Sequence, residues 1–425
     1  MVNKIHKYLA HIKFFYGWIV VIGCFISSAS YGLFYSLGIF FKSFQHEFGW
    51  SAGLISSIHS FHLMVFVVAV PFMGRMADRY GIRKIFSLCA VLGGMGFILC
   101  STVQALWHFY LFYAIATLGV AVATALPTSI VQKWFVKKKG LALGIVSSGI
   151  GAGPIIVAPT VNYLVSRFGW RVSYLIIGGT ALIILLIIAQ VLIDRPEDIG
   201  LRPLGEEQFD ANMETELENK GSTTLSKEEW STRDAIKSKA FILLGIIWML
   251  SALPVHMIMI HIVPYAIDMG ISRGAAAAAL GLIGGFSIGG RLLGGTFADR
   301  WGWVKTLIIA AFVSTIAILW LLIVKNYFML LVFVVMYGFS YGARVPQIPG
   351  LVGTYFGTKN LTEILGVTWA IAGFGGMLGP LVGGLVFDIT GSYTNAFVFA
   401  SACFGLTGVL AVFLKKPQLT RGSQD

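Results

Sequence analysis

Charged residues are scarce in this sequence. Asp, Glu, Lys and Arg make up 12% of its 425 residues, and apolar residues make up 57%. A soluble domain covers its surface with about 25% charged residues. A chain with so little charge must turn most of its surface toward lipid, which argues against a soluble enzyme.

Cysteine is also rare, and this limits the chemistry that the chain can support. The four cysteines lie inside apolar runs and form no CxxC pair, so neither a metal site nor a disulfide framework is indicated. No nucleophile–base pair stands out, and we expect no cofactor. The net charge of +12 is divided into short clusters between apolar runs, which argues against a nucleic-acid partner.

What the sequence does have is a series of long apolar runs. A bilayer core of about 30 Å is crossed by about 20 helical residues. Runs of that length recur six times, then six more times after a polar gap. They lie near residues 16–41, 52–74, 84–102, 107–132, 140–166, 171–193, 240–267, 274–298, 305–324, 327–355, 361–387 and 393–414. We therefore predict an all-α membrane protein with twelve transmembrane helices in two pseudo-symmetric six-helix bundles.

The polar gap and the basic residues predict the domains and the orientation. The bundles would span 1–193 and 240–425, joined by a linker at 194–239 that holds most of the 19 acidic residues. Most of the 31 Lys and Arg residues fall on the side of the membrane that carries the N-terminus, which predicts cytoplasmic termini. We expect a multi-pass protein of a bacterial inner membrane that functions as a monomer in the lipid bilayer.

The two halves share a sequence repeat. Residues 74–84 read GRMADRYGIRK, and residues 295–305 read GTFADRWGWVK, so that Asp78 and Asp299 stand 221 positions apart. Gly81 and Gly302 are separated by the same offset. Parallel repeats of this kind are typical of transporters that rock around a central site.

These loops resemble the motif Gly-x-x-x-Asp-Arg-x-Gly-x-Arg-Lys of the major facilitator superfamily. The resemblance implies that the loops form a cytoplasmic gate, closed by charge contacts that break on rocking. The predicted gate residues are Gly74, Asp78, Arg79, Asp299 and Arg300.

A second segment resembles monocarboxylate transporters. Residues 134–153 read WFVKKKGLALGIVSSGIGAG, and residues 36–51 also resemble that family and the related oxalate/formate antiporters. The resemblance implies that Arg291, eight residues before Asp299, binds a substrate carboxylate. A guanidinium group suits this role because its planar fork matches a carboxylate.

A second arginine lies within an apolar run. Tyr337, Tyr341 and Arg344 follow i, i+4, i+7 spacing and share a helix face. We expect Tyr341 to donate a hydrogen bond to substrate, while Arg344 is either a second anion site or a gate residue. Pro346 and Pro349 should distort this helix.

Further candidates are polar or aromatic residues placed to face a central cavity. Two of these candidates are Ser287 and Tyr35. The animal monocarboxylate carriers have an aspartate and a lysine at these two positions, so the resemblance does not extend their proton symport to this chain. The remaining cavity candidates are Ser28, Tyr31, Thr124, Trp369 and Phe374.

A second group of titratable residues is the predicted site of proton coupling. His261, Tyr265 and Asp268 share one helix face near the external mouth, and His261 and Asp268 could pass protons. The same residues could instead form an external gate. His256 is five residues from His261 and is expected to point elsewhere.

The leading hypothesis is alternating-access transport of a small monocarboxylate, such as lactate or pyruvate, together with a proton. One alternative is a dicarboxylate or organic-anion antiporter that uses Arg291 and Arg344 and exchanges a counter-anion. Another is a sensor that binds a carboxylate without moving it.

Overall fold

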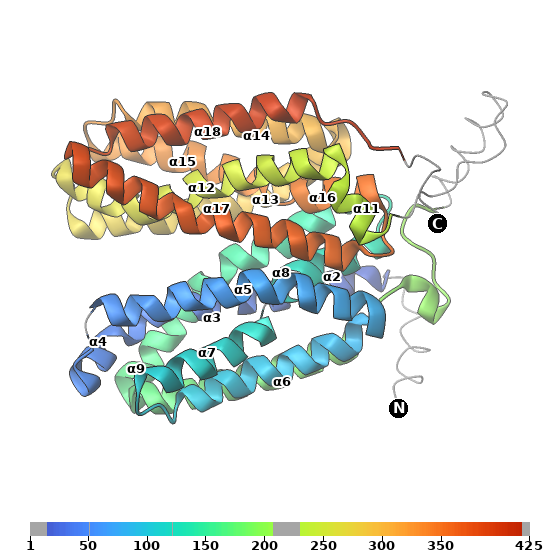
Figure 1. The fold of residues 1–425 in the computed structure, drawn as a ribbon, viewed down its shortest axis with the longest axis horizontal. Helices are drawn as coiled ribbons and strands as arrows, with labels where there is room; N and C mark the ends of the chain where they lie inside the picture. Colours follow the sequence, from blue (N-terminus) through green and yellow to red (C-terminus); the bar gives the residue numbers. More distant parts are fainter. Residues whose placement is uncertain (1–14, 51, 121, 207–229, 419–425) are drawn as a thin grey trace.

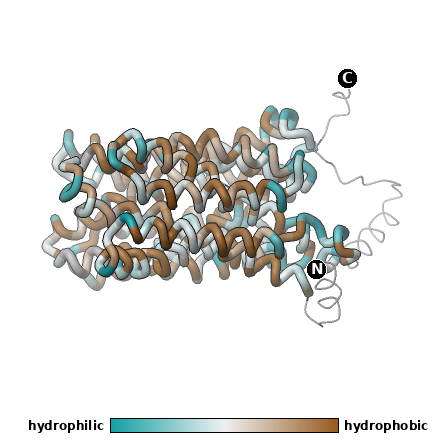
Figure 2. Tube along the Cα trace, turned by 90° about the horizontal axis from the view of Figure 1, so that it is seen from below, coloured by the Kyte–Doolittle hydropathy of each residue, from teal (hydrophilic) through white to brown (hydrophobic). Residues whose placement is uncertain are grey.

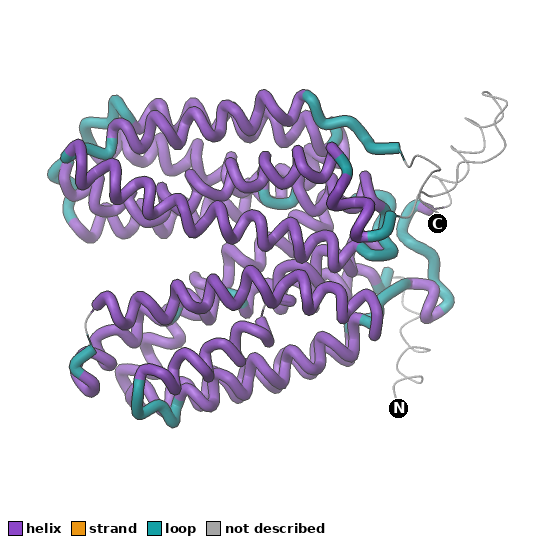
Figure 3. Tube along the Cα trace, viewed as in Figure 1, coloured by secondary structure: helices purple, strands orange, loops and turns teal. Residues whose placement is uncertain are grey.

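The computed structural model describes residues 15–206, except 51 and 121, and residues 230–418. Long helices run lengthwise through the molecule, and the loops gather at its two ends (Figure 3). The first half of the chain forms one bundle and the second half another (Figure 1). The helices are α2 (Gly17–Ser30), α3 (Gly32–Tyr35), α4 (Leu37–Phe48), α5 (Ala52–Tyr80), α6 (Ile82–Cys100), α7 (Leu106–Val120), α8 (Val122–Trp134), α9 (Lys139–Val191), η1 (Pro196–Ile199), α11 (Thr232–Lys237), α12 (Lys239–Asp268), α13 (Arg273–Trp301), α14 (Trp303–Leu321), α15 (Tyr327–Arg344), α16 (Gln347–Phe356), α17 (Leu361–Thr390) and α18 (Thr394–Val412).

The number of spans agrees with the prediction. Within the described ranges, eleven helical segments are long and apolar enough to cross a bilayer. One of them, α9, is 53 residues long and contains two predicted spans. They meet at Gly169, whose φ of 75° and ψ of 169° lie outside the helical region and are readily adopted by glycine. The all-α membrane fold predicted from the apolar runs is thus confirmed.

Local side-chain chemistry sets several helix ends. Ser238, Ser272 and Asn326 precede α12, α13 and α15, and each accepts a hydrogen bond from a backbone N–H in the first turn. Gly49 and Gly391 end α4 and α17 in the left-handed conformation. Caps of this kind satisfy backbone groups that the helix itself leaves unpaired.

Two of the spans are interrupted near the middle of the molecule. The first is divided into α2, α3 and α4 by breaks at Tyr31 and Ser36. The other breaks between α15 and α16, where Pro346 cannot donate a backbone hydrogen bond. This confirms the predicted distortion at Pro346, whereas Pro349 lies inside α16. Both interruptions border the cavity described below.

The outer surface of the bundles is apolar. Val68, Phe328 and Ile389 are 71%, 75% and 83% exposed, which would be unfavourable in water and is suited to lipid. Hydrophilic residues concentrate toward the two ends of the molecule (Figure 2). The surface therefore matches a protein that spans a bilayer along its long axis.

The halves meet toward one end of the molecule. We call this the terminus end, because α2 begins and α18 ends there, and the opposite end the far end (Figure 1). A buried cluster that includes Phe66 and Ala125 of the first half and Leu351 and Leu365 of the second joins the halves. Two further clusters, around Phe109 and around Phe333, each consist of residues from one half. The structure is therefore closed at the terminus end.

Candidate functional site

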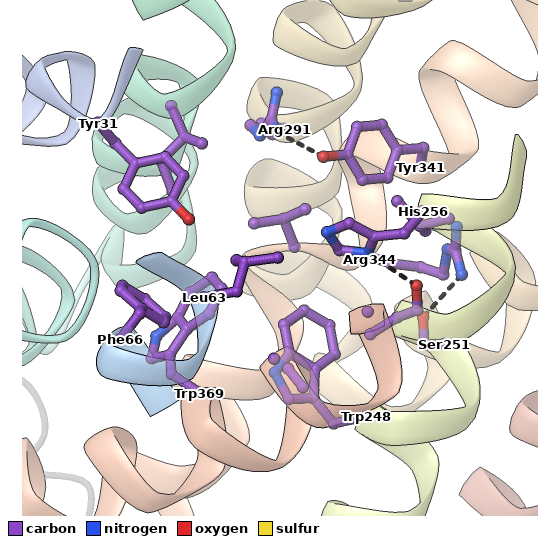
Figure 4. Close-up of a pocket in the computed structure, with 17 residues that line it drawn as sticks. Tyr31, Leu63, Phe66, Trp248, Ser251, His256, Arg291, Tyr341, Arg344 and Trp369 are labelled. Carbon is purple, nitrogen blue, oxygen red and sulfur yellow. Dashed lines mark hydrogen bonds between the residues drawn. The ribbon is translucent and has the colours of Figure 1, made fainter. Parts of the chain in front are cut away.

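A cavity of about 120 Å³ lies between the two halves. Its walls come from the junction of α2 and α3, from α5 and α9, and from α12, α13, α15 and α17. Aromatic and aliphatic side chains form most of the lining, and the polar groups belong mainly to the second half (Figure 4). An apolar cavity with a few convergent polar groups is the usual form of a small-molecule site.

Arg291 extends from α13 into this cavity and is 1% exposed. Its Nη1 donates to the Ser287 hydroxyl at 2.6 Å, and its Nη2 donates to the Tyr341 hydroxyl at 3.4 Å. The buried Nε has no hydrogen-bond partner. The side chain is held from two sides and still has a donor to offer, as expected of an anion-binding arginine.

Arg344, on α15, lines the same cavity and is also 1% exposed. Its Nη1 donates to the Ser251 hydroxyl at 2.7 Å, and its guanidinium lies 3.8 Å from the centre of the Phe404 ring. Tyr337 interacts with it electrostatically, yet neither Nη2 nor the Tyr337 hydroxyl makes a hydrogen bond of ordinary geometry. Its Nε also donates to the Ser340 carbonyl oxygen at 3.4 Å, so neutral groups surround this charge.

Neither arginine is paired with a carboxylate in the described part of the chain. The ion pairs found there involve other residues, and the described cavity lining contains no Asp or Glu. A buried charge is costly unless it is paired. The cavity is therefore electrostatically complementary to an anion.

The structure separates the other predicted cavity residues into groups. Tyr31, Tyr341 and Trp369 line the cavity together with the two arginines. Ser287 lies behind Arg291 and holds it. The side chains of Tyr35 and Thr124 lie outside the described residues.

Three predicted residues lie away from the cavity. Ser28 is buried where α2 packs closely on Gly149 of α9. Tyr337 is fully buried and stacks on Tyr341 at a ring distance of 6.3 Å. Phe374 is 52% exposed and is directed away from the lining. In this conformation none of the three lines the cavity.

Sequence reasoning missed one wall of the site. Trp248, Ser251 and His256 project from α12 into the cavity (Figure 4). His256 points away from the face of His261, as expected, but no role in the cavity was predicted for it. The missed signal was the helical spacing of Trp248, Ala252 and Val255, which places three lining residues on one face of α12.

The proposed proton-passing pair lies outside this cavity. His261 Nε2 lies 3.1 Å from the Pro380 carbonyl oxygen, and Asp268 is exposed at the end of α12. Tyr265 donates instead to the Leu321 carbonyl oxygen at 2.7 Å. The described contacts do not join His261 to Asp268.

The repeated aspartates cap helices of the opposite half. Asp78 Oδ2 accepts a hydrogen bond from the backbone N–H of Glu363, at the start of α17, at 2.9 Å. Asp299 accepts from the backbone N–H groups of Gly140 and Leu141, at the start of α9, at 2.6 and 3.0 Å. A carboxylate is stabilised at a helix N-terminus by the free N–H groups and the helix dipole.

Glycines allow the backbones to approach closely beside these caps. A Cβ on Gly74 would lie 2.5 Å from the Thr362 carbonyl oxygen, and one on Gly140 would lie 2.0 Å from that of Gly295. Arg79 and Arg300 are exposed beside the aspartates. The predicted gate residues thus lie together at the closed terminus end.

Comparison with known proteins places the chain in a family. The model of the Major Facilitator Superfamily matches residues 20–324 and 298–424. The chain belongs to the major facilitator superfamily. Its fold agrees, since a double tryptophan mutant of XylE superimposes with a TM-score of 0.76 at 13% identity, covering 95% of this chain and 97% of that one.

Similar sequences in this superfamily are monocarboxylate transporters. Monocarboxylate transporter 12 of Xenopus laevis is 30% identical over 420 residues, covering 95% of this chain and 91% of that protein. Human monocarboxylate transporter 11 is 26% identical and covers 91% of this chain and 80% of its own length. The chain is thus a multi-pass membrane transporter that resembles these animal proteins along most of its length.

Proposed function

We propose that this transporter carries small carboxylate anions by alternating access and that Arg291 binds the carboxylate. The observation that carries the proposal is a fully buried guanidinium that faces the cavity with no carboxylate partner among the described residues. The carboxylate would occupy the donors on Arg291 while Ser287 and Tyr341 fix the side chain. The names of the similar proteins agree with this substrate class.

Lactate or pyruvate, moving with a proton, is the substrate that we favour. The rest of the lining is largely apolar, with Trp248 and Trp369 in edge-to-face contact at 5.7 Å, which suits a small acid with an apolar body. The terminus end would lie in the cytoplasm, and His261 and Asp268 would pass protons at the far end. We place the protein in a bacterial inner membrane.

Uptake into proteoliposomes tests the proposal. Labelled lactate should accumulate under an inward proton gradient and exchange against internal lactate without a gradient. Arg291→Lys keeps the charge but loses the planar fork, so both activities should fall, by about tenfold or more. The matched control, Arg233→Lys, changes an exposed arginine of α11. Failure to move any monocarboxylate of two to five carbons would contradict the proposal.

A dianion is the second candidate, favoured by Arg344. This arginine lines the same cavity and has no carboxylate partner among the described residues, so a dicarboxylate or another organic dianion could engage both guanidiniums. Exchange that requires a preloaded dicarboxylate and is lost in Arg344→Gln would support this candidate. Lactate transport that persists in the same variant would support the first.

A further inference from the structure

His256 is the one imidazole among the described residues that line the cavity. Its Nδ1 lies 3.0 Å from the carbonyl oxygen of Ala252, one turn earlier on α12. A carbonyl oxygen only accepts hydrogen bonds, so Nδ1 carries a hydrogen. The other nitrogen, Nε2, is therefore the atom at which this side chain gains or loses a proton.

The ring is held in place by α17. A Cβ added to Gly376 would lie 2.9 Å from both Cε1 and Nδ1 of His256 and 3.2 Å from Nε2. A side chain at position 376 would consequently push the ring from its place. The glycine positions His256 at the wall that also carries Tyr341 and Arg344 (Figure 4).

The charged and titratable groups that face His256 are few. Arg291 comes from α13, Tyr341 and Arg344 come from α15, and Tyr31 comes from the junction of α2 and α3. The described lining from α5, α9 and α17 is entirely uncharged. Two fixed positive charges therefore dominate the electrostatic environment of Nε2.

The two arginines make proton binding depend on the substrate. A proton on Nε2 of the empty cavity is repelled by both guanidiniums in a medium of low dielectric constant. A bound carboxylate opposes that repulsion and attracts the proton. By linkage, the proton must strengthen carboxylate binding by the same factor that the carboxylate strengthens proton binding.

From this arrangement we infer that His256 carries the co-transported proton, which Nε2 holds while a monocarboxylate is bound at Arg291. The inference rests on the proposed function. The empty cavity holds two positive charges, and the loaded cavity holds three positive charges and one negative charge, so the net charge is the same. The empty and fully loaded transporter can then change conformation with equal charge. Binding of the carboxylate alone, or of the proton alone, would change the net charge of the cavity.

The test compares gradient-driven accumulation with exchange in proteoliposomes. In His256→Gln, lactate accumulation driven by an inward proton gradient should fall by about tenfold or more, while lactate–lactate exchange, which needs no net proton movement, continues at a lower rate. The control His46→Gln changes an exposed histidine of the first half and should leave both activities unchanged.

His261→Gln separates this assignment from a proton site at the far end. Accumulation that survives in His256→Gln but is lost in His261→Gln would overturn the inference. Wild-type protein that exchanges no monocarboxylate would instead refute the proposed function.

Gly376→Ala serves as a second variant if His256→Gln does not fold. It keeps the imidazole but displaces it, so the pH profile of uptake should change while exchange persists. A wild-type pH profile in Gly376→Ala would count against the role of His256.

Discussion

Replacing the repeated aspartates should open the terminus end. Asp299→Asn removes the charge that accepts hydrogen bonds from Gly140 and Leu141 at the start of α9. A hydrogen bond to a charged group contributes about 1.5–3 kcal/mol, and an anion at a helix N-terminus adds about 0.3–1 kcal/mol. Because Asp299 is exposed, solvent screening lowers the expected loss to about 1 kcal/mol.

That loss corresponds to about a fivefold shift away from the conformation described here. Asp78→Asn should act similarly, since Asp78 caps α17 in the opposite direction across the interface. The two caps share no partner, so the double variant should lose about 2 kcal/mol and shift the equilibrium about thirtyfold.

Distances between spin labels can measure this shift. Tyr80 and Trp301 are 52% and 51% exposed, and each follows a motif aspartate at the terminus end. Labels at these positions should report a longer separation in a growing fraction of molecules, from the single variants to the double variant. Unchanged distances, or a double variant no different from Asp299→Asn, would refute the view that the two caps hold this end closed.

Three further predictions follow from single contacts. Gly140→Ala places a Cβ 2.0 Å from the Gly295 carbonyl oxygen and should prevent closure of the terminus end, measured with the same labels. Glu47→Gln should lower the free energy of unfolding by about 1 kcal/mol, because Glu47 pairs with Arg171 at 2.9 Å and accepts from Trp170; thermal denaturation in detergent would check this. Ser287→Ala removes the 2.6 Å contact to Arg291 and should raise the KM for lactate about fivefold or more, a value that uptake kinetics would provide.

The fold was predictable because its signals are local and repeated. Length and hydropathy define a membrane span without knowledge of its neighbours. The 221-residue offset between Asp78 and Asp299 then identifies two equivalent halves. The break at Pro346 was also predictable, since proline lacks the backbone donor that a continuous helix requires.

The site was predictable only in part because a cavity depends on contacts between helices distant in sequence. A buried arginine in an apolar run is conspicuous, and both Arg291 and Arg344 line the cavity. Phe374 was assigned to it on residue type and helix alone, and the rotation of α17 turns its side chain outward. His256 was missed for the same reason. Tyr337 does share a helix face with Tyr341 and Arg344, but it lies one turn away from the cavity and is buried against Tyr341.

The close glycine contacts at the terminus end have a consequence for how such a protein diversifies. Gly74 and Gly140 bring main chain against main chain, and the aspartate caps also bind main-chain N–H groups. Contacts made to the main chain are kept when most of the neighbouring side chains are replaced. Substitutions in the cavity can therefore change the substrate specificity while the contacts that close the terminus end stay the same.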